Sequence, residues 1–164
     1  MVVIHGTARF RDRVPAPDSG VDRPTTTALG NWYATVLFWR PQVALFVNEA
    51  TLLPVLMPLA PASSVLTRFP DAVAGTLRAH GLRVAFIERE AEQLADCRLA
   101  KTESRSVVGS MNGFRALAEH YYRDREELDL MKLALRLAET PCGPLYSTYI
   151  SPDRALLALA TAGG

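Results

Sequence analysis

Residues 32–59 carry the feature that most constrains the fold, a dense run of aromatic, β-branched and other apolar residues with short polar breaks. Its segments NWYATVLFW, VALFVN and TLLPVLMPL suit a pleated, packed surface and predict a three-stranded antiparallel meander. Because side chains alternate along a strand, Trp32 and Trp39 are expected on opposite faces. Both faces are apolar, so other elements must cover both. Pro54 and Pro58 cannot donate to a β-ladder, which places the third strand at a sheet edge or puts a bulge in it.

The second half of the chain is predicted to be mainly helical, with a short strand at CRLAKT, residues 97–102. Pro70 and Asp71 are typical of a first helical turn, and Gly81 of a helix end. Ser151 and Pro152 are a cap and a first helical residue in the same way. Helices are therefore expected over residues 70–81, 82–96, 110–122, 126–139 and from 152 onward.

A length of 164 residues fits one ordinary domain, which we take as residues 1–164. The prolines and small polar residues between Asp12 and Gly30 predict a flexible loop at about 12–28, joining a first short strand to the main body. The expected fold class is α+β, an antiparallel β-meander packed against four to five α-helices.

Charge and cysteine usage exclude several classes of protein. With 18 basic and 17 acidic side chains, the net charge of +1 argues against a nucleic-acid binder that relies on bulk charge, although a local basic patch stays open. Cys97 and Cys142 match neither a metal-ligand spacing nor a disulfide scaffold, so we expect buried free thiols in a reducing compartment. The first residues meet charge too early for a signal peptide, and no apolar run is long enough for a membrane span. The prediction is a soluble cytoplasmic protein without a metal or cofactor.

The stretch AKTESRSVVGSMNGF, residues 100–114, is the strongest candidate for a site. As strand, loop and helix, it lets Gly109 relax the backbone and Ser110 cap a helix whose first amides would attract an anion. The expected anion cradle consists of Lys101, Thr102, Arg105, Ser106, Ser110 and Asn112, with Asn31, Trp32 and Asn48 as a pocket rim. The alternative is a structural turn in which the same residues only cap and hinge the chain.

Catalytic residues cannot be assigned from this pattern. A serine nucleophile needs a base within hydrogen-bond reach, and His120 would lie about 15 Å from Ser110 along one helix. His80 is most simply a cation at a helix end, whereas His5 on the first strand is unconstrained. The chain also lacks the G-x-S-x-G elbow of serine hydrolases.

Three segments, LGNWYATVLFWRPQVALFVNEATLLPVLMPLAP, AKTESRSVVGSMNGF and LALRLAETPCGPLY, resemble an uncharacterised bacterial family known only as a domain of unknown function. The resemblance runs from about Leu29 to the C-terminus and includes an LGxWYAxxLF hairpin and an RSVxGxMN core. Gly113 stands where the family pattern implies an acidic residue. The resemblance implies no reaction, but it raises the expectation that the cradle and rim residues work together.

Two classes of function remain open at this point. The first is a small-ligand-binding or regulatory module, with a homodimer formed through the apolar helix at 126–139. The second is an enzyme that acts on a phosphorylated or otherwise anionic small molecule.

Overall fold

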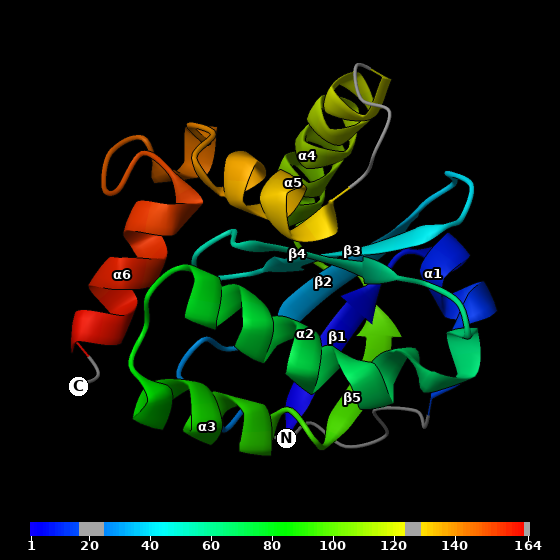
Figure 1. Ribbon diagram of the computed structural model, residues 1–164, viewed down its shortest axis with the longest axis horizontal. Helices are drawn as coiled ribbons and strands as arrows, with labels where there is room; N and C mark the ends of the chain where they lie inside the picture. The colour runs from blue at the N-terminus through cyan, green and yellow to red at the C-terminus, as the bar shows by residue number, and fades with distance from the viewer. Residues whose placement is uncertain (17–24, 124–128, 163–164) are drawn as a thin grey trace.

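The computed structural model describes residues 1–16, 25–123 and 129–162, which fold into a mixed sheet between two layers of helices (Figure 1). The strands are β1 (Val2–Gly6), β2 (Trp32–Leu37), β3 (Val43–Asn48), β4 (Pro54–Pro58) and β5 (Cys97–Lys101). The helices are α1 (Ala8–Arg13), α2 (Val65–Ala79), α3 (Val84–Gln93), α4 (Arg105–Arg123), α5 (Leu130–Ala138) and α6 (Pro152–Ala162). Short 3₁₀ turns lie at Ala62–Ser64 and Gly143–Leu145.

The sheet has the strand order β4-β3-β2-β1-β5. The antiparallel meander is confirmed for β2, β3 and β4, and β4 lies at the edge, as its prolines require. A purely antiparallel sheet is wrong, however, because β1 pairs in parallel with both β2 and β5. The α+β class holds in the broad sense, with six α-helices in the described part of the chain rather than four or five.

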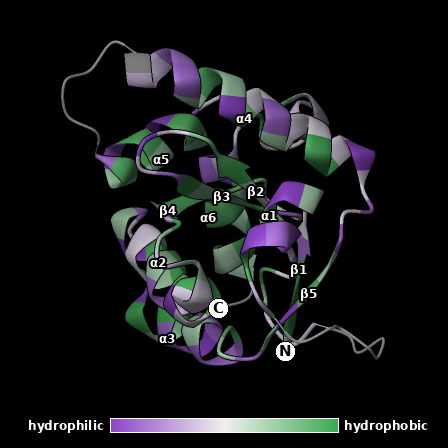
Figure 2. Cartoon of the chain, turned by 90° about the vertical axis from the view of Figure 1, so that its right-hand side faces the viewer, coloured by the Kyte–Doolittle hydropathy of each residue, from purple (hydrophilic) through white to green (hydrophobic). Residues whose placement is uncertain are grey.

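Each face of the sheet carries its own hydrophobic core. Trp32, Ala34 and Val36 of β2 pack against α1, α2 and α3, while Tyr33 and Leu37 pack against α4 and α5. Trp39, just beyond β2, belongs to the second core, so the two tryptophans lie on opposite faces as expected. In Figure 2 the hydrophobic strands are enclosed between the two helical layers.

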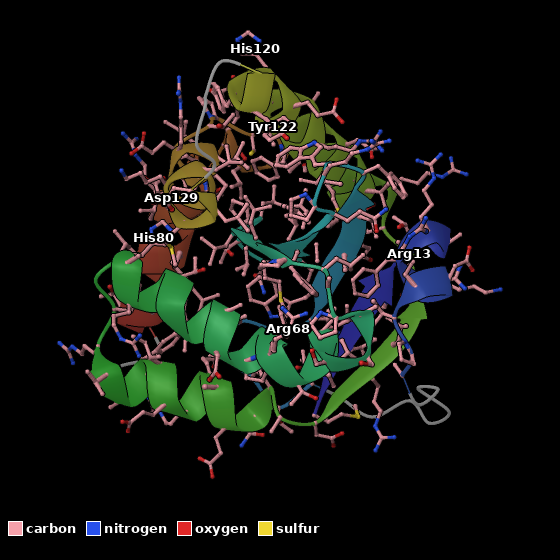
Figure 3. All side chains as sticks on the ribbon, turned by 45° about the vertical axis from the view of Figure 1, so that its right-hand side comes forward. Arg13, Arg68, His80, His120, Tyr122 and Asp129 are labelled. Carbon is pink, nitrogen blue, oxygen red and sulfur yellow. The ribbon has the colours of Figure 1, made fainter. Side chains whose placement is uncertain are left out.

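Helix α2 begins at Val65, five residues before the expected start, so Pro70 lies inside the helix. The guanidinium of Arg68 (Figure 3) donates to the carbonyl oxygens of Pro58, Leu59 and Pro61 at 2.9–3.1 Å, which ties the first turn to the end of β4. These tertiary contacts, together with the burial of Val65, favour a helical turn ahead of a proline that alone would mark a helix start.

The expected loop at about 12–28 needs correction at its beginning. Asp12 and Arg13 form the last turn of α1, whose N-cap is Thr7, since the Thr7 hydroxyl accepts from the Phe10 amide. Residues 17–24 lie outside the described residues.

Helix α5 covers only part of the expected 126–139 segment, whose first residues, with Leu128, lie outside the described ones. Its apolar side, Leu133, Ala134, Leu137 and Ala138, is buried within the same chain, whereas Met131 is exposed. None of the described helices combines the length and apolar character needed to cross a membrane.

Candidate functional site

Helix α4 starts at Arg105, which corrects the expected start at Ser110. Ser104 is the N-cap, because its hydroxyl accepts from the Val107 amide at 3.2 Å and its carbonyl accepts from the Val108 amide at 3.1 Å. The amides of Arg105 and Ser106 therefore occupy the first turn, where backbone N–H groups have no helical acceptor. Gly109 and Ser110 lie inside the helix, so the amides that follow them cannot bind an anion as expected.

Helix α4 starts next to the carboxyl ends of β1 and β5, from which the chain continues to opposite faces of the sheet. Strands β1 and β5 are adjacent and parallel, with Gly6 opposite Lys101. After β1 the chain enters α1, whose Phe10 belongs to the core on one face, and after β5 it enters α4 on the other face. In open α/β sheets, ligands bind in the crevice outside such carboxyl ends. We call Thr7 and residues 101–105 the carboxyl edge.

His5 is the most constrained polar side chain near this edge. It is only 6% exposed, and its Nδ1 lies 2.8 Å from the carbonyl oxygen of Lys101. Since a carbonyl can only accept, Nδ1 carries the proton, and Nε2 of the neutral ring is left as an acceptor. Nε2 has no hydrogen-bond partner among the described residues. The structure thus fixes the orientation of a histidine whose second nitrogen contacts no hydrogen-bonding group in the described part of the chain.

Tyr33 connects His5 to the start of α4. The two rings stack with centroids 4.8 Å apart, and the Tyr33 hydroxyl accepts from the Ser104 amide at 2.9 Å. Beside them, the hydroxyls of Thr7 and Thr35 lie 3.2 Å apart. The rest of the sheet face that α4 and α5 cover is apolar, so these hydrogen-bonding groups form the polar end of that face.

Basic side chains surround the same end of the sheet. Those on α1, on the β2–β3 hairpin and at the carboxyl edge are Arg9, Arg11, Arg13, Arg40, Lys101 and Arg105, and the acidic ones are Asp12 and Glu103. Six basic and two acidic groups give a local excess of four positive charges in a chain whose net charge is +1. Arg11 is held at the edge by a 3.1 Å bond from its Nε to the Gly6 carbonyl. The carboxyl edge is therefore locally suited to anions.

The structure divides the expected cradle into two groups. Lys101, Thr102 and Arg105 lie together at the carboxyl edge, whereas Ser106 and Ser110 line a groove of about 390 Å³ between α4 and residues 140–144. Asn112 is exposed, and it lies about 10 Å from Arg105 along the axis of α4. His120 lies near the far end of the same helix, as Figure 3 shows, and cannot assist Ser110.

The expected pocket rim is a structural corner instead. Trp32 and Asn48 are fully buried, and Trp32 faces the side of the sheet opposite α4. The Asn48 amide donates to the Leu29 carbonyl at 2.8 Å, and its carbonyl oxygen accepts from the Thr51 amide at 2.9 Å. Asn31 accepts from the Val3 amide at 3.0 Å. These bonds hold loops to strands, so Asn31, Trp32 and Asn48 do not join the carboxyl edge in one pocket.

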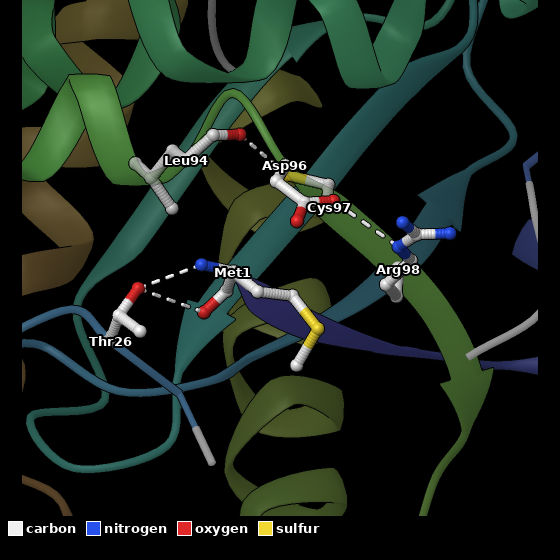
Figure 4. Close-up of polar contacts among 6 residues, drawn as sticks. All are labelled: Met1, Thr26, Leu94, Asp96, Cys97 and Arg98. Carbon is white, nitrogen blue, oxygen red and sulfur yellow. Dashed lines mark hydrogen bonds and ion pairs between the residues drawn. The ribbon is translucent and has the colours of Figure 1, made fainter. Parts of the chain in front are cut away.

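At the amino ends of β1 and β5, polar groups bind one another within the chain (Figure 4). The Cys97 thiol donates to the Leu94 carbonyl at 2.8 Å, and Arg98 pairs with Asp96 at 3.2 Å. Burial raises the pKa of the Cys97 thiol to about 12, so this thiol is a poor nucleophile. Both cysteines are free and buried, as expected.

Sequence reasoning missed Thr7 as part of the carboxyl edge and His5, Tyr33 and Thr35 as its neighbours. Each looks like an ordinary strand or cap residue, and only the parallel pairing of β1 with β5 brings His5 to Lys101, 96 residues later in the chain. The one available signal was the small pair Gly6 and Thr7 at the end of a strand, directly before a helix.

Comparison with known proteins gives one match. A family model described as "Domain of unknown function (DUF6933)" matches residues 3–155, nearly the whole chain. Searches of curated proteins and of solved structures found no match.

Proposed function

The chain belongs to the DUF6933 family, and from that premise we propose that it is a binding module for a phosphorylated or otherwise anionic small molecule at the carboxyl edge. The observation that carries the proposal is the coincidence of the first amides of α4 and an excess of basic side chains at the point where the strand connections diverge.

Each part of this edge has a separate role in the proposed binding. The amides of Arg105 and Ser106 supply directional donors, and the guanidinium of Arg105 supplies charge in a planar, bidentate form. Lys101 adds a second positive charge at the end of β5. The acceptor nitrogen of His5, whose direction is fixed by the Lys101 carbonyl, can take a hydrogen bond from a hydroxyl group of the bound molecule rather than from its anionic group.

Calorimetric titration with inorganic phosphate and with ATP tests the proposal. The Arg105→Ala variant should bind more weakly by about 1.5–3 kcal/mol, the value of a hydrogen bond to a charged group, and Arg105→Lys should rescue only part of it. Arg115→Ala is the matched control, because this arginine lies about 15 Å further along α4. Arg105 is exposed, so its replacement should leave the fold intact. Absence of binding to the wild-type protein, or equal losses for both alanine variants, contradicts the proposal.

The alternative is an enzyme that acts on a phosphorylated small molecule at the same edge. The fixed orientation of His5 favours it, because a general base needs an acceptor nitrogen held in a defined direction. Phosphate release from a panel of phosphorylated metabolites tests this alternative. Turnover by the wild-type protein that is lost in His5→Gln, with binding retained, supports an enzyme. Binding without turnover supports a module that only binds.

Self-association through residues 126–139 stays a separate proposal. Met131 is the large apolar side chain that α5 leaves exposed, while the rest of its apolar side packs on the chain's own sheet. Light scattering at high micromolar concentration should show a dimer in the wild-type protein and a shift toward monomer in Met131→Lys. A monomeric wild-type protein contradicts the proposal.

A further inference from the structure

Two arginines and an exposed phenylalanine form a cluster where α1 meets the β2–β3 hairpin. The guanidinium carbons of Arg9 and Arg13 lie 5.2 and 4.7 Å from the centroid of the Phe38 ring. The Phe38 side chain is 43% exposed, although it continues the buried face that includes Trp32. Figure 1 shows α1 and the hairpin side by side at one end of the sheet, and Figure 3 labels Arg13 there. We call these three residues the Arg–Phe–Arg cluster.

Contacts within the chain account for part of this cluster, because both guanidinium groups pack on the Phe38 ring and Arg13 Nη1 donates to the Arg9 carbonyl at 3.1 Å. Arg9 and Arg13 are one helical turn apart on α1, where like charges repel and slightly destabilise the helix. No carboxylate within the described part of the chain pairs with either guanidinium, since the ion pair found there joins Arg98 and Asp96. The cluster therefore keeps two positive charges and an aromatic face exposed together.

We propose that the Arg–Phe–Arg cluster binds single-stranded nucleic acid. Aromatic side chains between basic groups are the usual means of holding such strands, because a base stacks on the ring while arginines contact the flanking phosphates. The positive excess at this end of the sheet also attracts a polyanion over a longer range. The net charge of the whole chain gives no sign of this basic patch, because the patch forms only where α1 packs beside the β2–β3 hairpin.

The geometry favours a single strand over other anionic partners. The cluster stands on an exposed hairpin end and a short helix, so a base can stack on the part of the Phe38 ring that the two arginines leave accessible or on their guanidinium planes. A duplex keeps its base faces stacked inside, so it would gain only the phosphate contacts. An acidic peptide would gain only carboxylate contacts, without a planar ring at each repeat.

Fluorescence anisotropy with labelled 12-nucleotide poly(dT) and poly(U), from 50 to 200 mM salt, tests the proposal. Phe38→Leu should weaken binding by at least about fivefold through lost stacking, while leaving the salt dependence unchanged. Arg9→Ala and Arg13→Ala should each reduce the slope of log affinity against log salt by about 0.7, the value for one phosphate contact on a single strand. Arg83→Ala, an exposed arginine before α3 at the other end of the molecule, should change neither quantity.

The controls separate this proposal from its competitors. A DNA duplex of the same sequence length should bind more weakly than the single strands, and polyglutamate should not compete. Equal binding of duplex and single strand, displacement by polyglutamate, or unchanged affinity in Phe38→Leu overturns the proposal, as does absence of binding at 50 mM salt. Because all three residues are exposed, the variants should unfold at the wild-type temperature. Thermal unfolding of each variant then checks that a loss of binding does not come from a loss of stability.

Discussion

Asn48→Ala should destabilise the protein strongly, because the Asn48 side chain is a structural bridge at the hairpin corner. It is fully buried, and its amide donates to the Leu29 carbonyl at 2.8 Å. Its carbonyl oxygen accepts from the Thr51 amide at 2.9 Å and from the Thr51 hydroxyl at 3.0 Å. At about 1 kcal/mol for each of these three bonds, and with the amide and hydroxyl donors of Thr51 left buried without an acceptor, the free energy of unfolding should fall by about 3–4 kcal/mol.

Urea denaturation followed by tryptophan fluorescence measures this loss, because Trp32 and Trp39 are both buried and report unfolding. A loss of this size is a large share of the roughly 5–15 kcal/mol that stabilises a typical domain. Asn112→Ala makes the same chemical change at an exposed position of α4, and its free energy of unfolding should stay within about 0.5 kcal/mol of the wild type.

The comparison of these two variants decides whether Asn48 acts in the scaffold or in a site. A loss below about 1 kcal/mol in Asn48→Ala refutes the assignment of these bonds as the support of the corner. Normal stability combined with lost ligand binding would return Asn48 to the functional site expected from the sequence.

Tyr33→Phe should cost about 1 kcal/mol in urea denaturation, because the Ser104 amide loses its hydroxyl acceptor at the start of α4; no loss would show that solvent replaces the hydroxyl. Gly113→Ala should raise stability by about 0.5–1 kcal/mol, since a Cβ there meets no atom within 4 Å and alanine favours the helix; a decrease would contradict the open space. Burial raises the pKa of Glu90 above its unfolded value, so the folded state retains a proton that the unfolded state releases. Its contribution to stability is present below pH 4.5 and is lost as pH rises through the folded pKa, and Glu90→Gln should remove this part of the pH dependence measured by denaturation. The Cys97 thiol should resist alkylation at pH 8 in the native protein and react in urea, as mass spectrometry would show, and rapid native labelling would disprove its protection.

Local sequence patterns were sufficient for elements whose residues interact mainly with their neighbours in the chain. The meander from Trp32 to Pro58 follows from alternating apolar residues and polar breaks, and the proline-containing strand lies at the edge for lack of N–H donors. The short strand at Cys97–Lys101 and the helix from Pro152 also follow from local signals. Because these strands are apolar on both faces, the sequence also requires that both faces of the sheet be covered.

The tertiary structure alone decided where these elements meet. Parallel pairing of β1 with β5 joins segments about 95 residues apart, and no local pattern specifies such a partner. That pairing places His5 against Lys101, and the Tyr33 hydroxyl accepts from the amide of Ser104, the N-cap of α4. Burial likewise made Asn48 part of the scaffold. The spacing of apolar residues indicates which side of a segment is buried. It does not indicate which distant strand the segment pairs with, because that choice depends on contacts that form only in the complete sheet.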